Sequence, residues 1–176
     1  MIKDSAKVKI YKEYNKLRVS LKEPQCEDST LVINNLPEES IVIKADEFKS
    51  PSSLFKGENG ELKRADYIIV SETDDDKVVL FIELKKTKDK EEEIIKQLKG
   101  SYCLFFYLKQ IGIEFWDNDD FLSGYRYRFI SFGHTSIRKN RTIITVKGKI
   151  HDKPENMMKI NWPNYTEFNK IAGTKH

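Results

Sequence analysis

Two apolar runs separated by a short acidic stretch constrain the fold of this chain more than any other feature. Residues 64–71 contain Tyr-Ile-Ile-Val, and residues 77–86 contain Val-Val-Leu-Phe-Ile. Strands that are apolar at successive positions are typical of a sheet that is covered on both faces. We therefore predict two neighbouring strands at the centre of a sheet.

The acidic stretch between the two runs, residues 72–77, indicates how the strands pair. If Asp74 and Asp75 form the loop of a two-residue hairpin, the numbers of facing residues add up to 149. Asp66 then lies opposite Glu83, with the Cβ atoms about 5 Å apart on one face of the sheet. Lys85 points to the same face, because side chains alternate along a strand.

Two carboxylates at this distance raise each other's pKa unless a positive charge lies nearby. A hard divalent cation with oxygen ligands, such as Mg²⁺, removes this conflict. Lys85 beside the pair can orient or deprotonate a water molecule, or neutralise charge on a phosphate. Metal ion, water and ammonium group together are a minimal set for phosphodiester hydrolysis.

The alternative is a cross-strand ladder of charges on an exposed strand, where a Glu-x-Lys pattern is common. Five consecutive apolar residues precede Glu83, and Asp66 is in register with it across the predicted hairpin. These two observations favour the catalytic interpretation.

Three segments resemble the PD-(D/E)xK nuclease superfamily: Arg-Ala-Asp-Tyr at 64–67, Phe-Ile-Glu-Leu-Lys-Lys at 81–86, and Gln-Leu-Lys-Gly-Ser at 97–101. The resemblance implies a restriction-endonuclease-like α/β (α+β) fold, a mixed β-sheet flanked by helices. It also implies that Asp66, Glu83 and the backbone carbonyl of Leu84 bind Mg²⁺, with Mn²⁺ able to substitute, and that Lys85 serves the attacking water. Ala65 stands where the motif has its proline, a departure that many members share.

Two predicted helices carry further candidates. The apolar spacing predicts a long helix over residues 88–110, in which Gln97 matches a polar residue that some members place near the active site. Residues 3–21 also have helical apolar spacing, and members often take an acidic metal ligand from their first helix. Glu13 is the candidate there, and Glu47 ranks behind it. For Gln97, Glu13 and Glu47 alike, the alternative is an ordinary solvated side chain.

The remaining pattern predicts short strands at 31–33 and 41–44, a loop at 48–60, a half-exposed strand at 125–132 and another strand at 142–146. Gly100 inside the long helix is expected to mark a close packing contact. The length of 176 residues suits one domain. We expect its core within about residues 1–150, with residues 151–176 as a C-terminal extension.

Positive charge is concentrated in residues 121–150, which contain seven Lys or Arg and no Asp or Glu. Since the whole chain has a net charge of +3, the other 146 residues together have a net charge of −4. This distribution is typical of a phosphate-facing surface, and a solvated sheet edge is the alternative. The candidate nucleic-acid contacts are Arg126, Arg128, Arg138, Lys139 and Arg141.

The same segment also contains alternating aromatic residues and one histidine. Tyr125, Tyr127 and Phe129 alternate with arginines, which fits either a stacking platform for single strands or a core face opposite a solvated face. His134 is interpreted as a loop histidine.

Composition excludes several classes. The two cysteines, Cys26 and Cys103, are far apart and without a metal-ligand pattern, so neither a zinc site nor a disulfide scaffold is expected. The chain begins without a signal-peptide pattern and has no apolar run of membrane-spanning length. We expect a cytoplasmic protein.

The sequence therefore predicts a Mg²⁺-dependent nuclease, most simply a DNA endonuclease in restriction, repair or defence, working as a homodimer if it cuts both strands. Two alternatives stay open. One is a catalytically silent module of the same fold that binds nucleic acid or a protein, and the other is an unrelated α+β interaction domain with a charge ladder.

Overall fold

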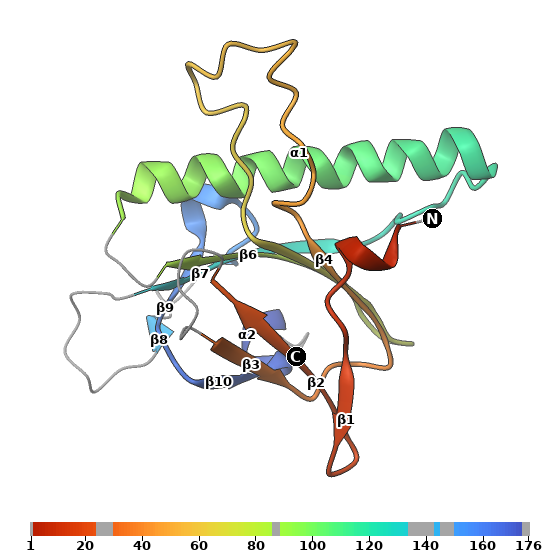
Figure 1. Cartoon of the computed structure of the whole chain (residues 1–176). Helices are drawn as coiled ribbons and strands as arrows, with labels where there is room; N and C mark the ends of the chain where they lie inside the picture. The colour runs from red at the N-terminus through yellow and green to blue at the C-terminus, as the bar shows by residue number, and fades with distance from the viewer. Residues whose placement is uncertain (1, 24–29, 86–88, 134–142, 145–149, 174–176) are drawn as a thin grey trace.

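The computed structural model describes residues 2–23, 30–85, 89–133, 143–144 and 150–173. Figure 1 shows the described residues in layers: the long helix α1 (Glu91–Trp116) crosses one face of a six-stranded sheet, and a four-stranded sheet lies on the other side together with the short helix α2 (Phe168–Ala172). Both sheets contain parallel and antiparallel pairs. The predicted mixed α+β class is confirmed.

The six-stranded sheet carries the candidate site. Its order is β4 (Glu39–Lys44), β5 (Tyr67–Glu72), β6 (Lys77–Lys85), β7 (Arg126–Gly133), β9 (Met158–Asn161) and β8 (Ile143–Ile144). β4, β5 and β6 are antiparallel neighbours, whereas β6, β7 and β9 run parallel. β6 is central and buried from Val78 to Leu84, as its continuous apolar run predicts.

The register of the β5–β6 hairpin agrees with the prediction. Tyr67 faces Ile82 and Glu72 faces Lys77, so the numbers of facing residues add up to 149. Between them, the Thr73 N–H donates to the Asp76 carbonyl at 2.8 Å and closes a loop of two residues. This register places Asp66 against Glu83 just beyond the last pair of the ladder.

The two faces of β6 enter two separate cores. Val79 and Phe81 pack with residues of α1, and Leu80 and Ile82 pack with residues of the four-stranded sheet. Because side chains alternate, Glu83 continues the row that faces α1. The site therefore lies between the sheet and the first turns of the long helix.

The predicted helix over residues 3–21 is wrong. The structure has a 3₁₀ turn (Asp4–Ala6) and a hairpin of β1 (Tyr11–Glu13) and β2 (Lys16–Lys22). Tyr14 and Asn15 form the turn with φ values of 48° and 61°, the conformation that two-residue hairpins require. Val19 and Leu21 are fully buried at alternate positions, so a period of two decides the structure of this segment.

The hairpin belongs to the four-stranded sheet, whose order is β1, β2, β3 (Thr30–Asn34) and β10 (Tyr165–Glu167). The strands predicted at 31–33 and 41–44 are confirmed as β3 and β4, but they lie in different sheets. The sequence between them therefore connects two layers.

The C-terminal residues are part of the core, which corrects the expectation of an extension at 151–176. After a 3₁₀ turn (Pro154–Asn156), β9 pairs with β7 in one sheet and β10 pairs with β3 in the other. Ile160, Phe168 and Ile171 are buried between the layers. Met157, Met158 and Ala172 are buried as well, and composition alone does not reveal these apolar contacts within a polar segment.

The long helix is confirmed with shifted bounds, since it continues beyond residue 110 to Trp116 and ends at Asp117 in the left-handed region. Gly100 marks the expected close contact: a Cβ there would lie 1.8 Å from the Lys63 carbonyl oxygen. The next residue, Ser101, accepts a hydrogen bond from Ala65 N at 2.8 Å. These contacts fasten α1 to the segment that carries Asp66.

We predict that Gly100→Ala destabilises the protein by about 1–3 kcal/mol, because the added methyl group meets backbone that cannot move aside. Gly112→Ala is the matched control on the same helix. Its Cβ would meet the Phe121 ring at 1.9 Å, a side chain that is only partly buried and can rotate away. Chemical denaturation of both variants tests this, and equal stability of the two would contradict it.

Candidate active site

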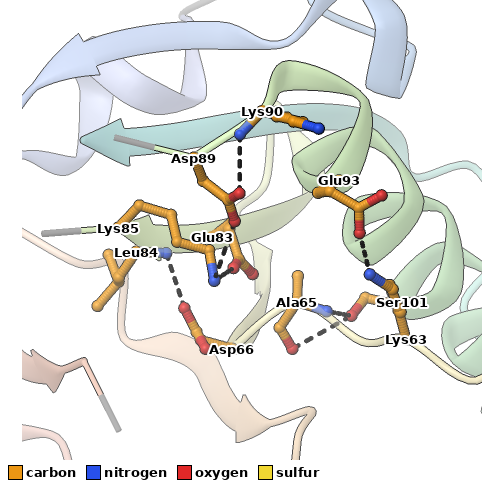
Figure 2. A network of polar contacts seen from close by, with 10 residues as sticks. All are labelled: Lys63, Ala65, Asp66, Glu83, Leu84, Lys85, Asp89, Lys90, Glu93 and Ser101. Atoms are coloured by element: carbon orange, nitrogen blue, oxygen red, sulfur yellow. Dashed lines mark hydrogen bonds and ion pairs between the residues drawn. The ribbon is translucent and has the colours of Figure 1, made fainter. Parts of the chain in front are cut away.

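Asp66 lies immediately before β5 and is only 8% exposed. Its Oδ2 accepts a hydrogen bond from Leu84 N at 2.7 Å, and its backbone carbonyl accepts one from Ala45 N at 2.8 Å. Figure 2 shows the Asp66 carboxylate directed at the backbone of β6, next to Glu83 and Lys85. Asp66 therefore joins the three antiparallel strands at one end of the sheet.

Glu83 is completely buried, at 0% exposure. Lys85 Nζ lies 2.9 Å from its Oε1, an ion pair by distance. The Lys85 ammonium and the Asp66 backbone N–H are polar neighbours of the Glu83 carboxylate, and both lower its pKa, but neither makes a well-aligned hydrogen bond to it. A carboxylate in an apolar layer without aligned donors is costly for a protein that lacks a use for it.

Lys85 joins Glu83 to the segment before α1. Its side chain is 15% exposed, and its Nζ lies 3.8 Å from Asp89 Oδ2 as well as close to Glu83. Asp89 Oδ1 accepts a hydrogen bond from Lys90 N at 2.7 Å. The ammonium group is thus held between Glu83 and Asp89, with one side open to solvent.

Burial raises the pKa of both carboxyl groups well above their usual range. For Asp66 the Leu84 N–H and the Lys85 ammonium oppose this rise, and the charges of Asp46 and Glu23 add to it. For Glu83 the neighbouring Asp66 raises the pKa further and Lys85 lowers it. One cation does not compensate for burial of two acids, so the pair resists full ionisation.

Burial works against the Lys85 ammonium, but the Glu83, Asp66 and Asp89 carboxylates outweigh it and raise its pKa above the usual value. Lys85 therefore keeps its proton at neutral pH. A charged lysine beside two acids that resist ionisation is a pattern typical of functional sites.

The donor set suits a hard divalent cation. Among the described residues, no three or more His, Cys, Asp or Glu side chains are arranged to hold a metal ion. The resemblance calls for two carboxylates and the Leu84 carbonyl, and Asp66 and Glu83 do lie together at the Leu84 backbone. The buried Glu83 oxygens without aligned donors have the acceptor character that Mg²⁺ requires.

The other metal-ligand candidates have different outcomes. Glu13 is on β1, in the other sheet, and pairs with Arg18. The structure therefore gives it a partner away from Asp66, and the helix on which its assignment rested does not form. Glu47 is exposed, whereas its neighbour Asp46 is the residue whose charge acts on Asp66.

Gln97 lies on α1 one turn before Ser101, on the helix side that is fastened to Ala65. Its Oε1 is buried and has no hydrogen-bond partner among the described residues. It is therefore not the ordinary solvated glutamine of the alternative interpretation.

Sequence reasoning did not include several polar residues around the pair. Ser131 faces Glu83 in the parallel neighbour β7 and is 5% exposed, and Lys159 faces Ser131 in β9. Lys159 Nζ lies 2.6 Å from Glu91 Oε2 at the start of α1. The sequence contains one signal of this polar position, because Ser131 interrupts an apolar run.

Arg126 and Arg128 have internal partners, and their assignment to a nucleic-acid surface stays a prediction. Arg126 makes a bidentate salt bridge with Asp76, with N···O distances of 2.8 and 2.5 Å. It also donates a hydrogen bond to the Ala172 carbonyl. Arg128 Nε donates to the Ile171 carbonyl at 2.8 Å. Both guanidinium groups thus bind carbonyls at the C-terminal end of α2.

The aromatic face of β7 belongs to the core. Tyr127 and Phe129 contact the rings of Phe81 and Tyr102, with Phe81 and Phe129 stacked at 4.7 Å. This selects the core interpretation over a stacking platform, and the strand is buried from Phe129 to Phe132 rather than half exposed throughout. The other candidates of the basic segment lie outside the described residues: His134, Arg138, Lys139 and Arg141.

Comparisons of the chain with protein-family models, with curated proteins and with solved structures found no match. None of the helices in the described ranges is long and apolar enough to cross a membrane. Cys103 is free and exposed, and Cys26 lies outside the described residues.

We predict that, without metal, Glu83→Gln stabilises the protein at neutral pH by about 1–3 kcal/mol, since each pKa unit corresponds to about 1.4 kcal/mol. An acid whose pKa is raised by folding binds more protons in the folded than in the unfolded state. Stability therefore falls as pH rises from about 4 toward the raised pKa. Denaturation from pH 4 to 8 should show a smaller fall in the variant than in the wild type.

Glu72→Gln is the matched control, because Glu72 also pairs with a lysine of the same hairpin, Lys77. Hydrogen bonds from Lys77 and Tyr125 lower the pKa of Glu72, so its loss should not stabilise the protein. A Glu83→Gln variant that is less stable than the wild type at neutral pH would show that Glu83 is a structural ion-pair partner instead.

Proposed function

We propose that the protein is a Mg²⁺-dependent nuclease that hydrolyses phosphodiester bonds, with DNA the expected substrate ahead of RNA. The observation that carries the proposal is the buried Glu83 carboxylate, which lacks aligned hydrogen bonds and lies beside Asp66 and Lys85. A restriction-endonuclease-like fold is supported by the order of elements around it: the antiparallel β5–β6 hairpin, the long helix α1, and β7 parallel to β6.

Asp66, Glu83 and the Leu84 carbonyl are the groups that would hold the metal ion. When bound, the ion polarises a phosphate oxygen and lowers the pKa of a bound water. Before that, Glu83 and Asp66 must lose any protons they carry, because only carboxylates bind a hard cation. Burial then serves the site, since fixed charges act strongly where water is excluded.

Lys85 would act through its charge. Its raised pKa keeps the ammonium protonated, so it suits donation to the attacking water or to a phosphate oxygen better than removal of a proton. Its partly exposed side chain reaches both the buried pair and solvent. Asp89 on its other side would hold the amine in place.

Among the predicted contacts to the nucleic-acid backbone, Arg126 and Arg128 already bind Asp76 and α2 through their guanidinium groups. Arg138, Lys139 and Arg141 remain candidates for this role. Cleavage of both strands of a duplex would most simply need a two-fold homodimer. Roles in restriction, repair or defence stay predictions from the resemblance.

The test is cleavage of plasmid, single-stranded DNA and RNA with Mg²⁺ or Mn²⁺. We expect wild-type cleavage of at least one substrate. Activity should fall by about a hundredfold or more in Glu83→Gln, which removes a metal ligand, and in Lys85→Met, which removes the ammonium group beside the reacting phosphate. Glu72→Gln is the control that keeps full activity.

Equal cleavage by the wild type and Glu83→Gln would refute the site. Metal binding with no cleavage of any substrate would instead favour the silent module, which keeps the fold but binds nucleic acid or a protein.

A further inference from the structure

A second hollow of the molecule lies outside the Asp66–Glu83 pair. It has a volume of about 640 Å³, within the range of pockets that bind small molecules. One wall is α1, and the other is the loop of residues 46–63, which Figure 1 shows projecting beyond the helix. Six apolar side chains line it: Phe48, Pro51, Leu54, Phe55, Leu104 and Tyr107.

The lining is aromatic and partly exposed. The rings of Phe48 and Tyr107 are in contact at 5.7 Å, and Phe55 on the projecting loop is 53% exposed. Leu54 beside it is 79% exposed. A protein gains nothing in stability from apolar side chains held in water around a hollow, so such a surface indicates a ligand.

A cation lies against these rings. The Arg64 guanidinium carbon is 5.7 Å from the centre of the Phe48 ring. Arg64 Nη1 donates hydrogen bonds to the backbone carbonyls of Glu61 and Lys63, at 3.1 and 2.5 Å, which hold the guanidinium group at the wall. The hollow thus combines flat apolar walls with a fixed cation, which suits a planar ligand that carries negative charge at its edge.

Further positive charge surrounds the opening. Lys96 and Lys99 line the hollow with Arg64, against one lining acid, Glu61, whose carboxylate accepts hydrogen bonds from the N–H groups of residues 57 and 59. The two lysines form ion pairs with Glu93 and Glu155 at the surface. Such exposed pairs contribute little and exchange readily for a phosphate.

The hollow adjoins the candidate active site. Arg64 is two residues from Asp66, at most about 7 Å along the backbone. Gly100, in the wall of the hollow, precedes Ser101, whose hydroxyl binds the Ala65 backbone. A nucleic-acid strand with one phosphate at Asp66 and Glu83 therefore brings a neighbouring nucleotide to this opening.

We propose that the hollow binds an unpaired nucleobase of a single-stranded or locally opened nucleic acid, stacked on the aromatic walls, with its phosphates at Arg64, Lys96 and Lys99. This assignment rests on the proposed function, because only that function brings a nucleic-acid strand to the opening. Every base has an apolar face that stacks on aromatic side chains, so the pocket accepts bases without selecting a sequence.

The test measures binding apart from cleavage, by fluorescence anisotropy of a labelled oligo-thymidine of about 12 nucleotides, with EDTA present. Phe55→Ala and Tyr107→Ala should each weaken binding about tenfold, the loss expected for one stacked base. Phe115→Ala is the matched control, since Phe115 is on the same helix, 73% exposed, and outside the lining. Both lining residues are half exposed, so their loss leaves the core intact.

A fully abasic oligonucleotide of the same length completes the test, because a pocket that accepts any base can take a neighbouring one when a single base is missing. Removal of all bases should weaken binding by the wild type more than binding by Phe55→Ala. If the lining variants bind like Phe115→Ala, or the wild type binds the abasic strand as tightly as oligo-thymidine, the hollow does not take a base and the inference is overturned, even where cleavage is intact. Stacking-dependent binding without metal-dependent cleavage would uphold the pocket and overturn the proposed chemistry.

Discussion

The burial of two carboxyl groups at one end of the β5–β6 hairpin is the constraint on which the site depends. Glu83 is fully buried and Asp66 nearly so, and Lys85 supplies one positive charge for both. Burial of a charge without full compensation destabilises a fold, and the raised pKa values of the pair express that cost. A metal ion that binds the ionised pair would turn this destabilising feature into a binding site.

The layers on both sides of β6 hold the pair in place. The core against the four-stranded sheet and the core against α1 fix the two faces of this strand, so Glu83 cannot turn toward water without disrupting one of them. The contact of Gly100 and Ser101 with the segment before β5 fixes Asp66 in the same way. The same contact connects the site to the aromatic hollow between α1 and the loop of residues 46–63.

Local sequence was sufficient to predict the hairpin, because a two-residue loop and two apolar runs leave one register for Asp66 and Glu83. It was insufficient for residues 3–21, where Leu17 and Leu21 fit a helical period and the buried Val19 between them fits a strand. Pairing of β2 with β3 determines that this segment forms a strand, and such long-range pairing is not visible in the local apolar pattern. The internal contacts of Arg126 and Arg128 could not be predicted for the same reason, since their partners in α2 lie more than 40 residues away.

The most direct test of the metal-site assignment is calorimetric titration of the protein with Mn²⁺ at neutral pH, in two buffers that differ in ionisation enthalpy. The account predicts binding accompanied by proton release, because Asp66 and Glu83 must ionise to become ligands, and loss of binding in Glu83→Gln. Binding with no proton release, or equal binding by Glu83→Gln, would contradict it and place the metal elsewhere. No binding at all would leave the buried pair without the ion that the account requires.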